Sequence, residues 1–412
     1  MPRTTSGHLL IADISGYTRY LTSSELEHAQ DVLSSLMGLL IDRTVPPLRV
    51  AGLRGDAVFS YGLAGAASSG QALVETVEET YVAFRRAIEQ MVLNTTCACN
   101  ACANISTLDL KFIVHHGTFS IMSLRGTDEL VGSAVNELFR LLKNTIVEAT
   151  GIHAYTAYTA QAVEALGLDG FTTDLVRHTE TYPGLDALTI WVQDMHLVWE
   201  KDRAGDRIHV PPDDVLARVD AELPVPLGVV WGLLLQPRYR SIVYGLDRQD
   251  SGQRQRGRIA EGSIFTCYHG KGSPTTQTVL AMQPMERMVT EDTTPIPGAR
   301  IFDEIGLEAR GDSTVVTITA SRARGPRLSR IVNDLVGRRL LGRRLGKGLA
   351  AFREAIEQEL GSGSLVIPER NVGIASQVEG AVADSLGSGG RDEHVHEPGT
   401  GDSGPAATRR NP

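Results

Sequence analysis

Short apolar runs alternate with helical repeats over the first half of the chain. The run at residues 9–12 predicts a buried strand that ends at Asp13. Apolar residues then recur at steps of three and four, which predicts a helix from about Glu25. Ser24 and Glu27 have the spacing of a capping box at the start of that helix.

The same two periodicities continue to about residue 199. They predict strands at 48–50, 57–61 and 110–114, and helices at 73–91 and 133–147. The first two strands are separated by a glycine-containing turn and so form a predicted hairpin. This order predicts an α+β domain over 7–199, with helices on one face of a mostly antiparallel sheet.

A polar segment at 200–214 predicts a linker to a second α+β domain over 215–360. That domain opens with an alternating strand and a helix at about 229–235, continues through several strands, and closes with a long amphipathic helix. Residues 361–412 are rich in Gly, Ser, Pro and charge, which predicts a disordered tail.

The composition narrows the classes of partner. The formal net charge is -9, which argues against a global electrostatic footprint for nucleic acid or for an anionic membrane. No run of about 18 apolar residues is present, so no transmembrane segment is expected. The first residues lack the features of a secretory signal. Four cysteines are too few for a disulfide framework in 412 residues, and a cytoplasmic location is expected.

Four polar residues are candidates for chemistry. Asp13 ends a predicted strand and Asp56 follows a hairpin turn, so neighbouring strands would bring both carboxylates to one sheet edge. Paired carboxylates suit Mg²⁺ or Mn²⁺ beside phosphate oxygens. Asn136 and Arg140 lie four residues apart on one helix face, where an arginine stabilises phosphate charge. Each residue taken singly also fits a turn or a solvated helix face.

The order of the surrounding motifs resembles class III adenylate and guanylate cyclases over roughly 140 residues. The matching segments are Asp13–Thr18 (DISGYT), Gly55–Ala57 (GDA), His115–Gly117 (HHG) and Gly132–Leu141 (GSAVNELFRL). The resemblance implies a ferredoxin-like cyclase palm domain. The segment that contains Cys97, Cys99 and Cys102 looks like an insert found in a bacterial subfamily.

The resemblance also implies a reaction and a site. Asp13 and Asp56, with the Ile14 carbonyl, would hold two Mg²⁺ or Mn²⁺ ions beside a nucleoside triphosphate. Asn136 would orient the ribose and Arg140 would stabilise the transition state. The products would be a cyclic nucleotide and pyrophosphate. In the family the two halves of the site come from opposite subunits, so a homodimer is implied.

Two positions depart from the family pattern. The base-reading lysine and its acidic or threonine partner correspond here to Gly52 and Ser133. A purine without its hydrogen-bond partners binds weakly and unselectively. Two hypotheses therefore stand: an active nucleotide cyclase, and a catalytically inactive cyclase-like module for dimerisation or nucleotide sensing.

Three cysteines crowd into one short segment. Cys97, Cys99 and Cys102 offer three thiolates, whereas zinc usually takes four ligands. His115 or His116 is a candidate for the fourth. The alternative is a loop of reduced cysteines.

The start of the second domain resembles START-like, polyketide-cyclase-like domains. An alternating strand at 219–223 leads through the prolines of 224–226 into a helix containing Trp231. The long last helix also fits that helix-grip fold. The resemblance implies a cavity between sheet and helix for a lipophilic small molecule.

Overall fold

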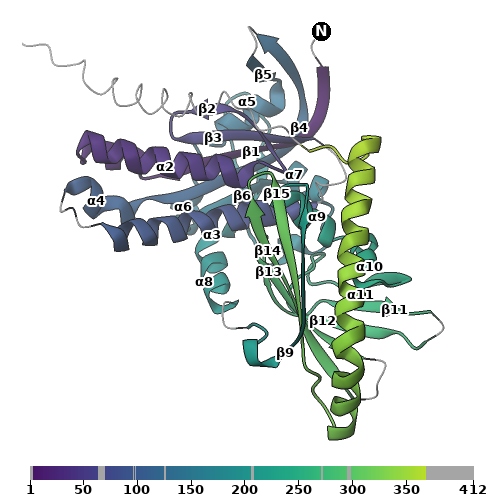
Figure 1. The fold of residues 1–412 in the computed structure, drawn as a ribbon. Coiled ribbons are helices and arrows are strands. Elements are labelled where there is room, and N and C mark those ends of the chain that lie inside the picture. Colours follow the sequence, from purple (N-terminus) through teal and green to yellow (C-terminus); the bar gives the residue numbers. More distant parts are fainter. Residues whose placement is uncertain are drawn as a thin grey trace, which may run out of the picture.

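The computed structural model describes residues 3–63, 70–95, 97, 99–124, 127–205, 208–270, 272–294 and 298–367. Two sheets form the framework, one in each half of the chain (Figure 1). The chain is therefore a mixed α+β protein. Within the described ranges, no helix combines the length and the apolar character that a membrane crossing requires. The predicted tail falls largely at 368–412, outside the described residues.

The first domain begins with β1, which is longer than the apolar run that predicted it. Its elements are β1 (Arg3–Ser15), α1 (Tyr17–Thr22), α2 (Leu26–Thr44), β2 (Arg49–Arg54), β3 (Ala57–Leu63), α3 (Gly70–Asn94), α4 (Asn100–Asn104), η1 (Ile105–Thr107), β4 (Asp109–Leu124), β5 (Thr127–Val131), α5 (Ser133–Arg140), α6 (Ile146–Thr150), β6 (Tyr155–Thr159), α7 (Ala160–Leu166), η2 (Phe171–Asp174), β7 (Val176–Glu180), β8 (Leu188–Asp194) and α8 (Met195–Gly205).

The first sheet has the strand order β2-β3-β1-β4-β6-β8-β7, with β5 added beside β4. All of its pairs are antiparallel except β4 with β6. Alternate residues of β1 enter two different cores: Leu10 and Ala12 pack with α2 and α3, whereas Leu9 and Ile11 pack with α5. Helices therefore cover both faces of the sheet, and the prediction of helices on one face is wrong.

Two local predictions also need correction. The expected helix over 133–147 is two helices, because the Asn144 side chain donates to the Leu141 carbonyl and accepts from the Ile146 N–H between them. The capping box at α2 does not form: the N-cap is Glu25, and its carboxylate accepts from the Ala101 N–H at 3.0 Å. In both places a specific side-chain contact decides the local structure.

The second domain is built on one antiparallel sheet. Its elements are η3 (Pro212–Asp214), β9 (Val215–Leu223), α9 (Leu227–Leu234), α10 (Pro237–Tyr244), β10 (Arg248–Gln253), β11 (Ile264–Tyr268), β12 (Thr275–Gln283), β13 (Arg287–Thr293), β14 (Arg300–Arg310), β15 (Ser313–Ser321) and α11 (Arg327–Ser362). The strand order is β10-β11-β12-β13-β14-β15-β9.

The long helix α11 runs alongside this sheet (Figure 1). Its apolar residues Leu345, Leu349 and Phe352 are buried against β9, β15 and α9–α10. The segment predicted as a linker, 200–214, contains the end of α8 and the short η3 turn, so the first part of that segment is helical. The part of 200–214 that the structure describes therefore carries regular structure at both ends.

Candidate functional site

Two acidic residues meet where β1 ends. Asp13 pairs with Ala57 in the β1–β3 register, and Asp56 precedes Ala57 in the β2–β3 turn. Gly55 in that turn has a φ of 64°, a left-handed conformation that glycine adopts without steric cost. The Ile14 N–H donates to the Asp56 carbonyl oxygen at 3.2 Å. The turn is thus fastened to β1 beside Asp13.

Two acidic side chains, Asp13 and Asp56, face one basic side chain, Lys111, at this end of β1. The Lys111 ammonium lies 2.9 Å from Asp13 Oδ2. Burial and, next, the neighbouring Asp13 carboxylate raise the pKa of Asp56 to about 6, against the opposing effect of Lys111. The two carboxyl groups therefore lie within electrostatic range of each other. A pair of carboxylates facing one lysine is an environment that favours an added cation.

The other two candidates lie on α5. Asn136 and Arg140 are both exposed, and the Arg140 guanidinium donates to the Pro183 carbonyl oxygen at 2.8 Å. The hydrogen bonds and ion pairs within the described ranges join neither residue to Asp13 or Asp56. The chain thus brings the two carboxylates together and leaves the asparagine and arginine on an exposed helix surface.

The His-His-Gly segment on β4 serves packing. His115 is buried, its Nδ1 lies 2.9 Å from Thr159 Oγ1, and burial followed by His116 lowers its pKa to about 4. It is therefore neutral at physiological pH. A Cβ built at Gly117 would lie 2.6 Å from the Ala134 Cβ, so the glycine allows α5 to approach β4 closely.

The two positions that depart from the cyclase pattern differ in exposure: Gly52 is buried, whereas Ser133 is exposed. Gly52 lies in β2 beside a register shift between Val50 and Gly52. A Cβ built there meets only the Arg54 guanidinium, at 3.6 Å, which is an ordinary contact. Ser133 is exposed at the first position of α5. The buried Gly52 position therefore has room for a Cβ, and the exposed Ser133 position faces solvent.

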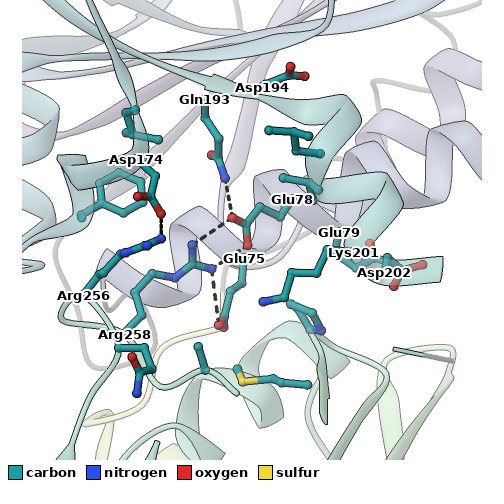
Figure 2. A pocket seen from close by; sticks show the side chains of 18 of the residues that line it. Glu75, Glu78, Glu79, Asp174, Gln193, Asp194, Lys201, Asp202, Arg256 and Arg258 are labelled. Carbon is teal, nitrogen blue, oxygen red and sulfur yellow. Dashed lines mark hydrogen bonds and ion pairs between the residues drawn. The ribbon is translucent and has the colours of Figure 1, made fainter. Parts of the chain in front are cut away.

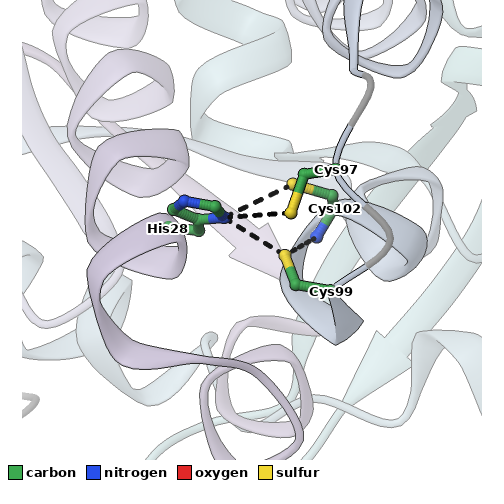
Figure 3. Close-up of side chains that lie close together, drawn as sticks. All are labelled: His28, Cys97, Cys99 and Cys102. Carbon is green, nitrogen blue, oxygen red and sulfur yellow. Dashed lines mark hydrogen bonds between the residues drawn. The ribbon is translucent and has the colours of Figure 1, made fainter.

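The cysteine segment lies against α2. Figure 3 shows the sulfur atoms of Cys97, Cys99 and Cys102 directed at the ring of His28. His115 and His116 lie on the central strand β4, and neither belongs to the cluster. The sequence reasoning missed His28 because it lies 71 residues from Cys99 in the chain.

A second polar cluster joins the two domains. Arg258 donates to both carboxylate oxygens of Glu78, at 2.9 and 2.6 Å, and lies 3.8 Å from Glu75 (Figure 2). The Trp231 indole N–H donates to Glu75 at 2.7 Å. Gln71 pairs with the backbone N–H and carbonyl of Ile259. The helix α3 of the first domain is thereby hydrogen-bonded to the second domain.

A cleft of about 640 Å³ lies beside this junction (Figure 2). Charged residues of its wall are paired across the domains: Arg256 with Asp174, and Glu286 with Arg86. Each of these two pairs joins the first domain to the second across the cleft.

The second domain has its own cavity, of about 220 Å³, between α11 and the sheet. Apolar residues such as Ile301 and Leu341 line it together with Gln277, Asp292 and Asp303. Gln277 donates to Asp292 at 2.9 Å. Burial and then the Asp292 charge hold the pKa of Asp303 well above its usual range. One side of the cavity is thus strongly polar.

A family model described as a protein of unknown function (DUF2652) matches residues 33–150. A curated relative, the uncharacterized protein Rv2561/Rv2562 of Mycobacterium tuberculosis, is 27% identical over 114 residues. The match covers 28% of this chain and 52% of that protein, so the chain spans about half the length of this relative.

Several solved structures are similar to parts of the chain. The adenylyl cyclase CyaB from P. aeruginosa is 13% identical, with 47% of this chain and 96% of that chain covered and a TM-score of 0.37. The guanylyl cyclase Cya2 is 17% identical, with 46% and 92% covered and a TM-score of 0.34. CalU16 from Micromonospora echinospora is 13% identical, with 52% and 98% covered and a TM-score of 0.24.

Proposed function

We propose that the first domain is a class III cyclase-like domain that converts a nucleoside triphosphate to a cyclic nucleotide and pyrophosphate. The observation that carries the proposal is the meeting of Asp13 and Asp56 at one sheet edge, fastened by the Ile14 N–H. The ordered motifs around them support the same function.

The residues at this edge fit a divalent cation. Asp13 and Asp56, with the Ile14 carbonyl, would hold two Mg²⁺ or Mn²⁺ ions, which supply charge neutralisation for the triphosphate. The unbalanced charge of the pair, with Lys111 as cationic neighbour, is the structural support for this assignment.

The remaining roles belong to residues on α5. The exposed Arg140 guanidinium would donate to the α-phosphate oxygens as charge develops there, and Asn136 would orient the ribose. Both residues are exposed, and no hydrogen bond or ion pair among the described residues joins them to the aspartates of the same chain. The proposal therefore includes a homodimer in which α5 of one protomer completes the site of the other.

The test is a cyclase assay of the full chain with four nucleoside triphosphates, each with Mn²⁺ and with Mg²⁺. We expect cyclic product from wild type, none from Asp13→Ala or Asp56→Ala, and unchanged activity from Asp42→Ala, an exposed control on α2. Mixing Asp13→Ala with Arg140→Ala protein should restore product, because a mixed dimer retains one intact site. Wild-type protein that yields no cyclic product under any of these conditions contradicts the proposal.

The cavity of the second domain favours a second function, ligand binding in a helix-grip fold. At about 220 Å³ it is smaller than the roughly 300–1,000 Å³ of ordinary ligand pockets. A wholly lipophilic ligand would leave the polar groups of Asp292 and Asp303 facing an apolar surface. We therefore propose a small ligand with an apolar body and a polar end.

Mass spectrometry of the material released from heat-denatured, purified protein tests this function. We expect a bound small molecule from wild type and none from Leu341→Trp, in which the larger side chain fills the cavity between α11 and the sheet. Phe or Trp substitution at exposed Val176, in the first domain, is the control and should leave the ligand bound. The absence of any ligand from wild type, or its retention by Leu341→Trp, would argue against the assignment.

A further inference from the structure

Four side chains that commonly bind metals surround one point between α2 and the segment after α3 (Figure 3). They are His28, Cys97, Cys99 and Cys102. The distances from the histidine Nδ1 to the three sulfur atoms, in chain order, are 3.7, 3.2 and 3.8 Å. All four ligand atoms lie within 4.8 Å of one another.

These separations are close to those of a tetrahedral zinc site. Zinc binds thiolate at about 2.3 Å and imidazole at about 2.0–2.1 Å, which at a tetrahedral angle gives about 3.6 Å between nitrogen and sulfur. Two sulfur ligands are then about 3.8 Å apart. The observed nitrogen–sulfur distances of 3.2–3.8 Å bracket the first value. An ion at the centre requires only small side-chain movements.

We propose that His28, Cys97, Cys99 and Cys102 form a structural zinc site. Three thiolates and one imidazole match the ligand preference of Zn²⁺, whereas Mg²⁺ and Mn²⁺ prefer oxygen. Four protein ligands fill the tetrahedron and leave no position for water or substrate. The site therefore stabilises the fold and takes no part in the chemistry at Asp13 and Asp56.

The surrounding contacts hold the ligands in place. The Cys102 N–H donates to Cys99 Sγ at 3.4 Å, which stabilises negative charge on that sulfur. The Glu25 carboxylate accepts from the Ala101 N–H at 3.0 Å and from the Asn100 side chain at 3.3 Å. These bonds attach the start of α4 to the start of α2 independently of the cluster, which positions the cysteines opposite His28.

The ion would close a long loop of chain. His28 and Cys99 are separated by 71 residues, and that interval contains the β2–β3 hairpin and the helix α3. A metal bridge across such a loop restricts the unfolded chain and couples metal binding to folding. The zinc site would thereby fix α2 and α4 to each other beside α1, the helix that follows Asp13.

The experiment measures metal bound to the full chain, purified with Zn²⁺ present and then desalted. We expect one zinc per chain in wild type by elemental mass spectrometry, and one Co²⁺ per chain after exchange, with the visible absorption of a tetrahedral thiolate site. His28→Ala should lose most of the bound metal. His28→Cys should retain it, because a fourth thiolate is an equivalent ligand. His153→Ala, an exposed histidine outside the cluster, should match wild type.

Two results would overturn the proposal. One is wild-type protein that holds no more zinc than the triple variant Cys97→Ser/Cys99→Ser/Cys102→Ser and shows no Co²⁺ spectrum. The other is full retention of metal by His28→Ala with a Co²⁺ spectrum identical to that of wild type. Because the Co²⁺ titration uses wild-type protein and His28→Cys keeps a full ligand set, a folding defect in the other variants does not obscure the answer.

Discussion

The buried ion pair between the two domains offers a sharp test of how they are joined. Arg258 lies between β10 and β11, and it is the cation that faces both Glu78 and Glu75 on α3. The side chains of Arg258, Glu78 and Glu75 are only 17%, 11% and 1% exposed. Replacing Arg258 by Met preserves the apolar stem of the side chain and removes its charge. Glu78 is then left as an uncompensated carboxylate in a poorly solvated junction, beside the buried Glu75.

The expected cost follows from this geometry. Breaking a buried pair by removing one partner destabilises a protein by about 3–5 kcal/mol, because the remaining charge is uncompensated. Glu78 also accepts from Gln193 at 2.6 Å, which places the loss at the lower end of that range. The double variant Arg258→Met/Glu78→Gln lacks the buried charge of Glu78. Its loss of unfolding free energy should therefore be smaller than the sum of the losses of the two single variants. A coupling free energy of about 1–3 kcal/mol is expected.

Urea unfolding monitored by tryptophan fluorescence measures the loss. Trp231 is 1% exposed and its indole is hydrogen-bonded to Glu75, so it is the tryptophan that reports on the junction. Trp191 and Trp199 contribute to the same signal and report on the first domain. The control is Arg353→Met, which breaks an exposed pair with Glu357 and should cost less than about 0.5 kcal/mol. A loss for Arg258→Met as small as that of the control would refute the claim that this pair joins the domains.

Three further predictions concern single positions. Burial raises the pKa of Glu75 from 4.5 to about 7, so protonated Glu75 stabilises the folded protein fully below pH 4.5, and this contribution is lost as the pH rises through 7. Between these pH values the unfolding free energy of Glu75→Gln should therefore rise relative to that of wild type by about 3 kcal/mol. Urea titrations at several pH values measure the difference. The buried Gly52 position has room for a Cβ, whose one neighbouring atom lies at 3.6 Å. Gly52→Lys should tighten nucleotide binding in calorimetry, and unchanged affinity in a variant with the wild-type circular dichroism spectrum would argue against a base-reading position. Gly117→Ala should lose about 1–3 kcal/mol in urea unfolding through its 2.6 Å approach to Ala134, whereas Gly38→Ala, in an open part of α2, should be neutral or slightly stabilising.

Much of the fold follows from local periodicity, and the exceptions have identifiable causes. The alternating and 3.6-residue patterns predicted β2, β3, α3 and the last helix, because each of these elements carries a regular repeat of buried apolar residues. The burial of β3 and of the first half of α3 on more than one face is set by the tertiary structure. The break between α5 and α6 was missed because Asn144 hydrogen-bonds to Tyr155, a contact that the local sequence does not contain. The failed capping box at Ser24 has the same kind of cause, since Glu25 binds a loop 76 residues away.

The residues of the candidate sites also fall into two groups, those that local sequence patterns indicate and those that only the tertiary structure brings together. The adjacency of Asp13 and Asp56 was predictable because each ends or turns a recognisable strand, and antiparallel pairing then brings them to the same end of the sheet. Their role as metal ligands stays a prediction. His28 was not predictable, because an exposed histidine on an amphipathic helix carries no signal until the chain folds and brings the cysteines to it. Arg258 was not predictable for a related reason: its partner Glu78 is 180 residues away in the chain, in the other domain. Sequence patterns therefore locate candidate groups that secondary structure alone positions, whereas groups paired across separate elements become visible only in the tertiary structure.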